Sequence, residues 1–119
     1  MSKKKIFTIG KDIIETEIKG LKALKTSLSD DFSKAVQLIL ENKKKIIFTG
    51  LGKSGYIARK VSSSFKSTGI SSLYLHPSEA SHGDLGVIDK GDILIIISNS
   101  GETNEISDII NFAKLKGVN

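Results

Sequence analysis

The segment 98–103, Ser-Asn-Ser-Gly-Glu-Thr, carries three hydroxyl groups and a glycine within six positions. It follows the most hydrophobic run of the chain, 93–97, and precedes a stretch with helical spacing. A helix N-terminus offers unpaired N–H groups and the positive end of the helix dipole, which together favour a bound anion. Because a helix cap needs only one hydroxyl, three of them at this point predict a phosphate site. The candidate phosphate-binding residues are Ser98, Asn99, Ser100 and Thr103.

A glycine-rich segment, 50–55, reads Gly-Leu-Gly-Lys-Ser-Gly and follows another apolar run. It satisfies the dinucleotide fingerprint G-x-G-x-x-G, but His76 stands where that fingerprint expects an acid after the next strand. Its Gly-Lys-Ser ending matches a P-loop, but Ile47 occupies a position where a P-loop needs glycine. The remaining interpretation is a tight strand-to-helix turn without a ligand. The cationic Lys53 beside a helix N-terminus, followed by Ser54, favours a ligand-binding role over a turn alone.

Alternating strand and helix patterns position these segments. Apolar spacing predicts helices at 9–28, 32–42, 54–67 and 103–116, and apolar runs predict strands at 46–49, 71–76 and 93–97. The strands are hydrophobic on both faces, which is typical of a parallel sheet covered by helices. We therefore predict an α/β fold with a three-layer αβα, doubly wound parallel sheet. Ligands bind such a sheet at the carboxyl ends of its strands, where the segments 50–55, 76–84 and 98–103 lie.

The same patterns predict how the chain is divided. Residues 8–42 are expected to form a helical lead-in and residues 45–119 an αβ core, within one domain over 1–119. A doubly wound domain usually has about five or six strands, so three strands predict the N-terminal part of such a domain. The helix at 9–28 is long for this core, and its apolar stripe leaves room for contact with a neighbouring subunit. The residues of the helix at 54–67 expected to face inward are Ile57, Val61, Ser64 and Phe65.

Composition and charge exclude several classes of protein. Of the 119 residues, 39% are hydrophobic and 26% are charged, as in soluble globular chains, and the lack of cysteine excludes a disulfide framework. No apolar run is long enough to span a bilayer and no secretory signal is present, so we expect a cytoplasmic protein without membrane partners. The net charge of +5 comes from scattered lysines, with Arg59 as the only arginine, which argues against a nucleic-acid interface.

Three motifs together resemble one family. They are Gly-Leu-Gly-Lys-Ser-Gly at 50–55, His-Pro-Ser-Glu-Ala-Ser-His-Gly-Asp-Leu-Gly at 76–86, and Ser-Asn-Ser-Gly-Glu-Thr-Asn-Glu-Ile at 98–106. All three are similar to motifs of the sugar isomerase domain family, and the resemblance covers nearly the whole chain. The segment 76–86 narrows it to the arabinose 5-phosphate isomerases of that family. This sequence departs from the pattern at Leu51 and Ser78, where the family usually has methionine and glycine.

The resemblance implies that D-ribulose 5-phosphate and D-arabinose 5-phosphate are interconverted through an enediolate, without a required cofactor. Its product would feed the synthesis of the lipopolysaccharide precursor Kdo, and family members are cytoplasmic homotetramers. The residues that it marks as catalytic are Lys53 and Glu105. Further candidate substrate-binding residues are Ser54, Gly69 and His76, the last from the resemblance. The resemblance also marks His82 as a zinc contact, but two histidines without paired carboxylates predict that no metal is required.

The chemistry of the candidate residues agrees with isomerisation. Proton transfer between adjacent carbons needs a base and a cation near the oxyanion, roles that fit Glu105 and Lys53, with Glu79 as a weaker base. A further glutamate and a histidine of the family lie beyond the equivalent of Asn119, so the isolated chain is expected to be inactive. Two alternatives remain open: a regulatory domain that binds a sugar phosphate without turnover, and a different phosphosugar isomerase.

Overall fold

The chain folds into two compact units, Met1–Gln37 and Leu38–Asn119. The computed structural model describes residues 1–101 and 104–118. The boundary falls inside the second helix, a few residues before the point at which the sequence patterns separate the helical lead-in from the αβ core. Within the described residues, no helix has both the length and the apolar content that a membrane-spanning segment requires.

Helix α1 (Lys3–Ser27) makes up most of the first unit and begins earlier than the predicted 9–28. Ser2 caps it, because its hydroxyl oxygen accepts a hydrogen bond from the Lys5 N–H at 3.4 Å. None of the residues of α1 is buried, so its apolar stripe of isoleucines and leucines is exposed. Ser29 caps α2 (Asp30–Glu41), because its hydroxyl oxygen accepts a hydrogen bond from the Asp31 N–H at 3.3 Å.

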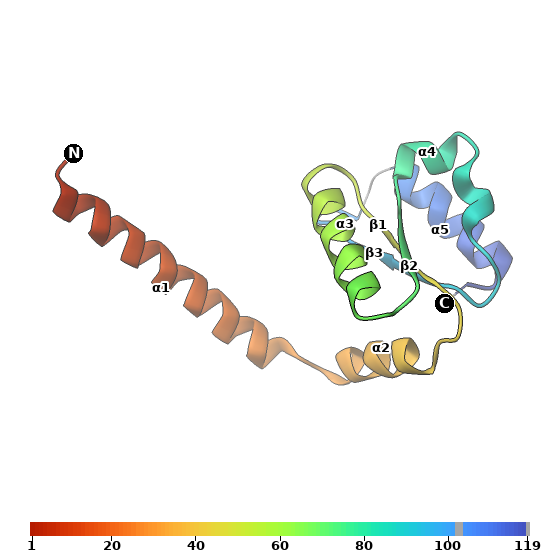
Figure 1. The fold of residues 1–119 in the computed structure, drawn as a ribbon, viewed down its shortest axis with the longest axis horizontal. Helices are drawn as coiled ribbons and strands as arrows, with labels where there is room; N and C mark the ends of the chain where they lie inside the picture. Colours follow the sequence, from red (N-terminus) through yellow and green to blue (C-terminus); the bar gives the residue numbers. More distant parts are fainter. Residues whose placement is uncertain (102–103, 119) are drawn as a thin grey trace. The chain divides into compact units, whose positions relative to one another are not determined.

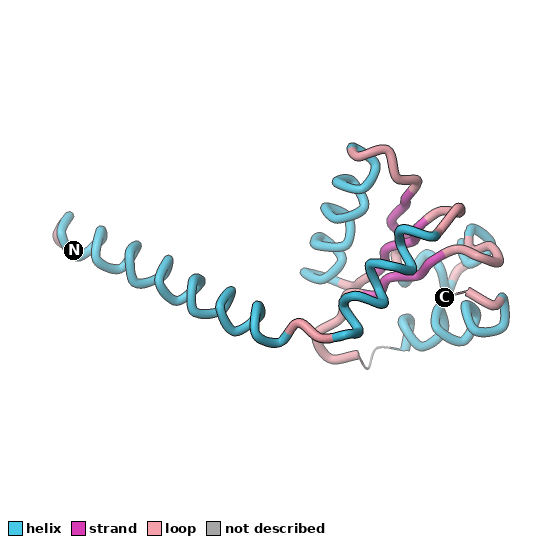
Figure 2. The backbone as a smooth tube through the Cα atoms, turned by 90° about the horizontal axis from the view of Figure 1, so that it is seen from below, coloured by secondary structure: helices cyan, strands magenta, loops and turns pink. Residues whose placement is uncertain are grey.

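The second unit is built on a three-stranded parallel sheet in the order β2-β1-β3. The strands are β1 (Ile46–Thr49), β2 (Ser72–Leu75) and β3 (Ile93–Ile96), and Figure 2 shows them side by side inside this unit. Every residue of β1 is buried, because this strand is paired on both edges and covered on both faces. The strands end level with one another, with Thr49 beside both Leu75 and Ile96. The predicted parallel sheet is confirmed.

Helices cover both faces of the sheet, which confirms the three-layer αβα arrangement (Figure 1). Helix α3 (Gly52–Ser67) lies on one face, and α5 (Asn104–Lys116) lies on the other with α4 (Pro77–Ser81) and the 3-10 helix η1 (Asp84–Val87). The buried cluster on the α3 face consists of Ile46, Phe48, Ala58 and Ile93. The buried cluster on the α5 face consists of Ile47, Leu75, Ala80, Ile88 and Ile109.

Helix α3 packs on the sheet mainly through small residues. Its buried residues are Gly55, Ala58 and Ser62. Ile57 is 56% exposed and Ser64 is also exposed, so the prediction that these two face inward is wrong. Small side chains let the helix backbone approach the strands, and this shifts the buried face around the helix relative to the larger apolar residues. Val61 and Phe65 pack against the core as predicted, with the Phe65 ring edge-on to Phe48 at 5.1 Å.

The segment 76–84 is largely helical, although the sequence patterns predict no helix between the strands at 71–76 and 93–97. His76 lies just beyond β2 and caps α4, with its Nδ1 accepting a hydrogen bond from the Ser78 N–H at 3.2 Å. Pro77 suits the first helical position, because its φ is fixed near the helical value and its missing N–H would have had no helical partner. The proline that marks the end of a strand in the sequence therefore also marks the start of a helix.

A buried ion pair closes the amino end of the sheet. Lys45 Nζ lies 2.7 Å from Asp92 Oδ2 and 2.9 Å from Asp89 Oδ2, and Asp92 is fully buried. Burial lowers the pKa of Lys45, but the hydrogen bonds and charges of Asp92 and Asp89 outweigh it and raise that pKa above its usual 10.5. The hydrogen bond from Lys45 and its charge lower the pKa of Asp89. Lys45 is therefore a structural residue and not one of the solvated lysines.

Candidate functional site

The glycine-rich segment 50–55 turns the chain from β1 into α3 at the carboxyl end of the sheet. Gly52 has a φ of 58°, a left-handed conformation that glycine adopts without steric cost. A Cβ on Gly55 would lie 2.5 Å from the Gly50 carbonyl oxygen, and a Cβ on Gly50 would lie 2.7 Å from the Ile97 carbonyl oxygen. Backbone geometry therefore requires all three glycines, and evidence for a ligand must come from the cavities beside this turn.

The first cavity, of about 290 Å³, lies between the glycine turn and the loop that follows β3. Its polar lining consists of Ser54 from α3 with Ser98, Asn99 and Ser100 from the loop. The Ser98 hydroxyl oxygen accepts a hydrogen bond from the Gly101 N–H at 2.8 Å, which holds the loop in a tight turn. The structure thus brings these four predicted residues together close to the start of α5. Thr103, the fifth, lies outside the described residues.

Lys53 and Glu105 come from the two helix starts that border the first cavity. Lys53 is exposed in the first turn of α3, between Gly52 and Ser54, which both line the cavity. Glu105 is half-buried in the first turn of α5 and precedes Ile106, another lining residue. Neither side chain lines the cavity itself, and neither takes part in an ion pair within 1–101 and 104–118. The predicted cation and the predicted base therefore each lie next to a residue that lines this cavity, on helices that cover opposite faces of the sheet.

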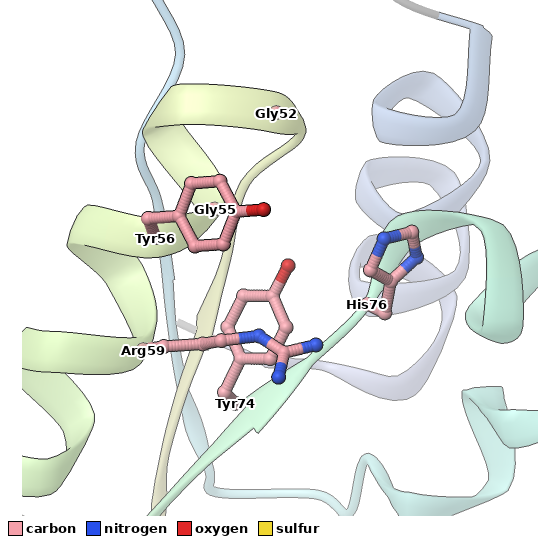
Figure 3. Close-up of a pocket in the computed structure, with 6 residues that line it drawn as sticks. All are labelled: Gly52, Gly55, Tyr56, Arg59, Tyr74 and His76. Atoms are coloured by element: carbon pink, nitrogen blue, oxygen red, sulfur yellow. The ribbon is translucent and has the colours of Figure 1, made fainter.

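A second cavity, of about 260 Å³, lies on the α3 side of the same edge of the sheet (Figure 3). Tyr56 and Arg59 reach it from α3, Tyr74 from β2, and His76 from the start of α4. The central guanidinium carbon of Arg59 lies 4.5 Å from the centre of the Tyr74 ring. The His76 ring is edge-on to Tyr74, with 6.3 Å between the ring centres. Gly52 lines both cavities, so the two adjoin at the glycine turn.

Two predicted site residues lie away from these cavities. Gly69 follows α3 and precedes β2 at the amino end of the sheet, so the structure does not bring it together with the other candidates. His82 is exposed at the C-terminal end of α4. Across the described part of the chain, no group of three or more histidine, cysteine, aspartate or glutamate side chains is arranged to hold a metal ion. Glu79, the weaker candidate base, lines a separate cavity beside η1.

The sequence patterns missed Tyr56, Arg59 and Tyr74. Tyr74 donates a hydrogen bond from its hydroxyl to the Gly50 carbonyl oxygen at 2.8 Å, which ties β2 to the glycine turn. The sequence does show that Tyr74 is two residues after Ser72 in a predicted strand, so both side chains point to the same face of the sheet, the α3 face. Tyr56 and Arg59 are three residues apart in a predicted helix, and this spacing places them on one face of it. Neither signal predicts that the two faces meet.

Comparison with known proteins places this geometry in a family. The SIS domain matches residues 39–119, which contain both cavities. The chain belongs to the SIS domain family. This membership confirms the resemblance of the three motifs to the sugar isomerase domain. A protein of Rickettsia prowazekii, described as uncharacterized, is 49% identical to this SIS domain chain over 104 residues, which are 87% of this chain and 33% of that protein.

Other relatives have more informative names. An arabinose 5-phosphate isomerase of Francisella tularensis is 48% identical over 101 residues, which cover 82% of this chain and 31% of that protein. A solved structure of an E. coli CFT073 protein in complex with arabinose 5-phosphate is 37% identical, with a TM-score of 0.89, over 99% of this chain and 63% of that one. This SIS domain chain therefore spans about a third of the length of the curated relatives it matches.

Proposed function

We propose that this SIS domain serves an aldose–ketose isomerase that interconverts D-ribulose 5-phosphate and D-arabinose 5-phosphate. The observation that carries the proposal is the first cavity, where Ser54, Ser98, Asn99 and Ser100 converge close to the start of α5. The name of the Francisella relative and the arabinose 5-phosphate bound by the E. coli protein support the choice of sugar.

The ligand's phosphate is proposed to sit in the first cavity. Serine hydroxyls and an asparagine amide can donate hydrogen bonds to phosphate oxygens, and a helix N-terminus adds N–H groups and a positive dipole end. Gly101 has a φ of 72°, a left-handed conformation that glycine adopts without steric cost and that turns the chain sharply after Ser98. This geometry suits a dianionic group better than a neutral one.

The proton transfer is assigned to the two helix starts that border this cavity. As base, Glu105 takes the proton from C1 of the ketose, and the electron pair forms the C1–C2 double bond of an enediolate. The Lys53 ammonium stabilises the negative charge that develops on the oxygen in this step. Return of the proton to C2, with movement of the hydroxyl proton between O1 and O2, gives the aldose. The reaction exchanges only protons, so we propose that no cofactor is needed.

The phosphate assignment is tested by replacing Ser98 and Ser100 together with alanine. Each lost hydrogen bond to a charged group is worth about 1.5–3 kcal/mol, so the KM for D-ribulose 5-phosphate should rise far more than kcat falls. Ser64→Ala is the matched control, because Ser64 is exposed on α3 and, within residues 1–101 and 104–118, its hydroxyl donates only to the Lys60 carbonyl oxygen. An unchanged KM in the double variant contradicts the assignment. Tight binding of the phosphosugar by the whole protein without any turnover would instead favour a regulatory domain.

We further propose that the domain works as a homo-oligomer, a tetramer by resemblance, in cytoplasmic synthesis of a lipopolysaccharide precursor. Support for oligomerisation comes from α1, whose large apolar side chains are exposed throughout. The exposed apolar residues of α1 are Ile6, Phe7, Ile9, Ile13, Ile14, Ile18, Leu21 and Leu24, at 38–71% of their surface. An exposed stripe of this length is typical of a helix that pairs with another subunit.

A further inference from the structure

The second cavity contains a cation that no acid neutralises. Arg59 is the only arginine of the chain, and over residues 1–101 and 104–118 no carboxylate lies within ion-pair distance of it. The other side chains that line the cavity are those of Tyr56, Tyr74 and His76, none of which is acidic. The proposed phosphate site does not use Arg59, because that site lies across the glycine turn in the first cavity.

Three of the side chains that line this cavity, those of Arg59, Tyr56 and His76, can donate hydrogen bonds into it. His76 Nδ1 accepts a hydrogen bond from the Ser78 N–H, so the neutral ring carries its proton on Nε2. The guanidinium of Arg59 has donors only, and the Tyr56 hydroxyl can donate. The Tyr74 hydroxyl directs its own proton to the Gly50 carbonyl oxygen and thereby holds its ring in place. A cavity with this set of donors is complementary to a group that only accepts.

The arginine is also held in position before any ligand arrives. Its guanidinium lies over the Tyr74 ring at 4.5 Å, and Figure 3 shows the guanidinium nitrogens directed toward the His76 side of the cavity. Gly55 lets the Tyr74 hydroxyl approach the helix, since a Cβ there would lie 2.8 Å from that oxygen. Restricting the planar fork of arginine in advance lowers the entropy lost when it binds a carboxylate or phosphate through two hydrogen bonds.

We propose that the second cavity is an oxyanion subsite, distinct from the phosphate site at Ser98–Gly101, that takes a carboxylate or phosphate group of a small molecule. The group can belong to the far end of a ligand whose phosphate occupies the first cavity, because the two cavities adjoin at Gly52. It can equally belong to a second, separate acid. Arg59 would bind the acidic group in the same way in both cases, and NMR titrations can separate the two without relying on isomerase activity.

The single arginine makes a direct measurement possible. In a protein of residues 1–119, the Nε–Hε group of Arg59 gives one side-chain signal in a two-dimensional NMR spectrum, and no other arginine overlaps with it. Titration with D-gluconate, a carboxylate without phosphate, should shift this signal with a dissociation constant on the order of 1–10 mM. Arg59→Gln should weaken gluconate binding roughly 10- to 100-fold, as judged from the Gly55 and Tyr56 amide signals. Lys60→Gln is the control, because it removes the same charge from the next position of α3, which does not line the cavity.

Two further titrations identify the source of the anion. If one ligand spans both cavities, 6-phospho-D-gluconate should bind at least tenfold tighter than gluconate and should lose that gain in Ser98→Ala. If the acid is separate, the two compounds should shift the Arg59 signal with equal affinity and Ser98→Ala should change neither. Either result supports the subsite. If neither compound shifts the Arg59 signal, the proposed subsite is wrong. It is also wrong if Lys60→Gln weakens gluconate binding as much as Arg59→Gln does, because the basic chain would then attract the anion without a specific site.

Discussion

Replacing Lys45 with methionine should strongly destabilise the αβ unit. The change removes the ammonium that both Asp89 and Asp92 contact, and it leaves the Asp92 carboxylate fully buried without a counter-charge. Breaking a buried pair from one side costs about 3–5 kcal/mol, because the remaining charge keeps its desolvation penalty. With a slope of about 2 kcal/mol per M urea, the unfolding midpoint should fall by roughly 1.5–2.5 M.

Two variants serve as controls for this experiment, which follows urea unfolding by circular dichroism. Lys34→Met removes an exposed pair with Asp31 of similar length, 2.9 Å, and should cost at most about 0.5 kcal/mol. Lys45→Met combined with Asp92→Asn removes both charges and should recover much of the stability. If Lys45→Met is as mild as Lys34→Met, the buried pair does not hold the fold as argued.

The pH dependence of the same pair has a defined sign. The pKa of Lys45 is raised in the folded protein, so its contribution is complete below about 10.5, the usual value, and is lost as the pH rises through the folded value. The pKa of Asp89 is lowered, so its contribution is complete above about 3.8 and is lost as the pH falls through the folded value. The contribution of this pair to the urea midpoint, measured as the difference between the wild type and Lys45→Met, should therefore be constant between these limits and shrink outside them.

Three further outcomes are expected. Gly55→Ala should destabilise the αβ unit by about 1–3 kcal/mol in urea unfolding, because its Cβ meets the Gly50 carbonyl oxygen; a neutral effect would mean that the turn can relax. Lys53→Met in the whole protein should lower kcat by roughly a hundredfold or more and change KM less. A change in KM alone would assign Lys53 to phosphate binding. Ile13→Glu should reduce the mass measured by light scattering, since Ile13 is 58% exposed on α1. An unchanged mass would exclude that stripe as the subunit contact.

Local patterns were sufficient to predict the elements that depend on neighbouring residues. The apolar runs of β1 and β3 and the spacing of Ile106, Ile109 and Ala113 in α5 match the structure within a residue or two. The position of the hydroxyl-rich loop at the end of β3 was predictable as well, because the apolar strand and the polar residues after it are consecutive in the sequence. These features require no knowledge of how distant segments meet.

Features that depend on tertiary contacts were not predictable in the same way. Lys45 and Asp89 are 44 residues apart, and nothing in a lysine run indicates which member is buried. Arg59 belongs to a helix and Tyr74 to a strand, so their cavity exists only once α3 lies against β2. On α3 the small residues are buried and Ile57 is exposed. Small side chains let the helix backbone lie close to the sheet, which buries more surface than a large side chain that holds the helix at a distance.

Helix α1 has 25 residues and buries none of them, which has a thermal consequence. The heat capacity change of unfolding scales with the apolar surface that becomes exposed, and the unfolding of α1 exposes little. A helix without packing partners melts gradually, so far-UV circular dichroism should lose part of its signal over a broad temperature range. Scanning calorimetry should record no corresponding heat-capacity step. Where another subunit covers α1, the gradual loss should disappear and the melting temperature should rise with protein concentration.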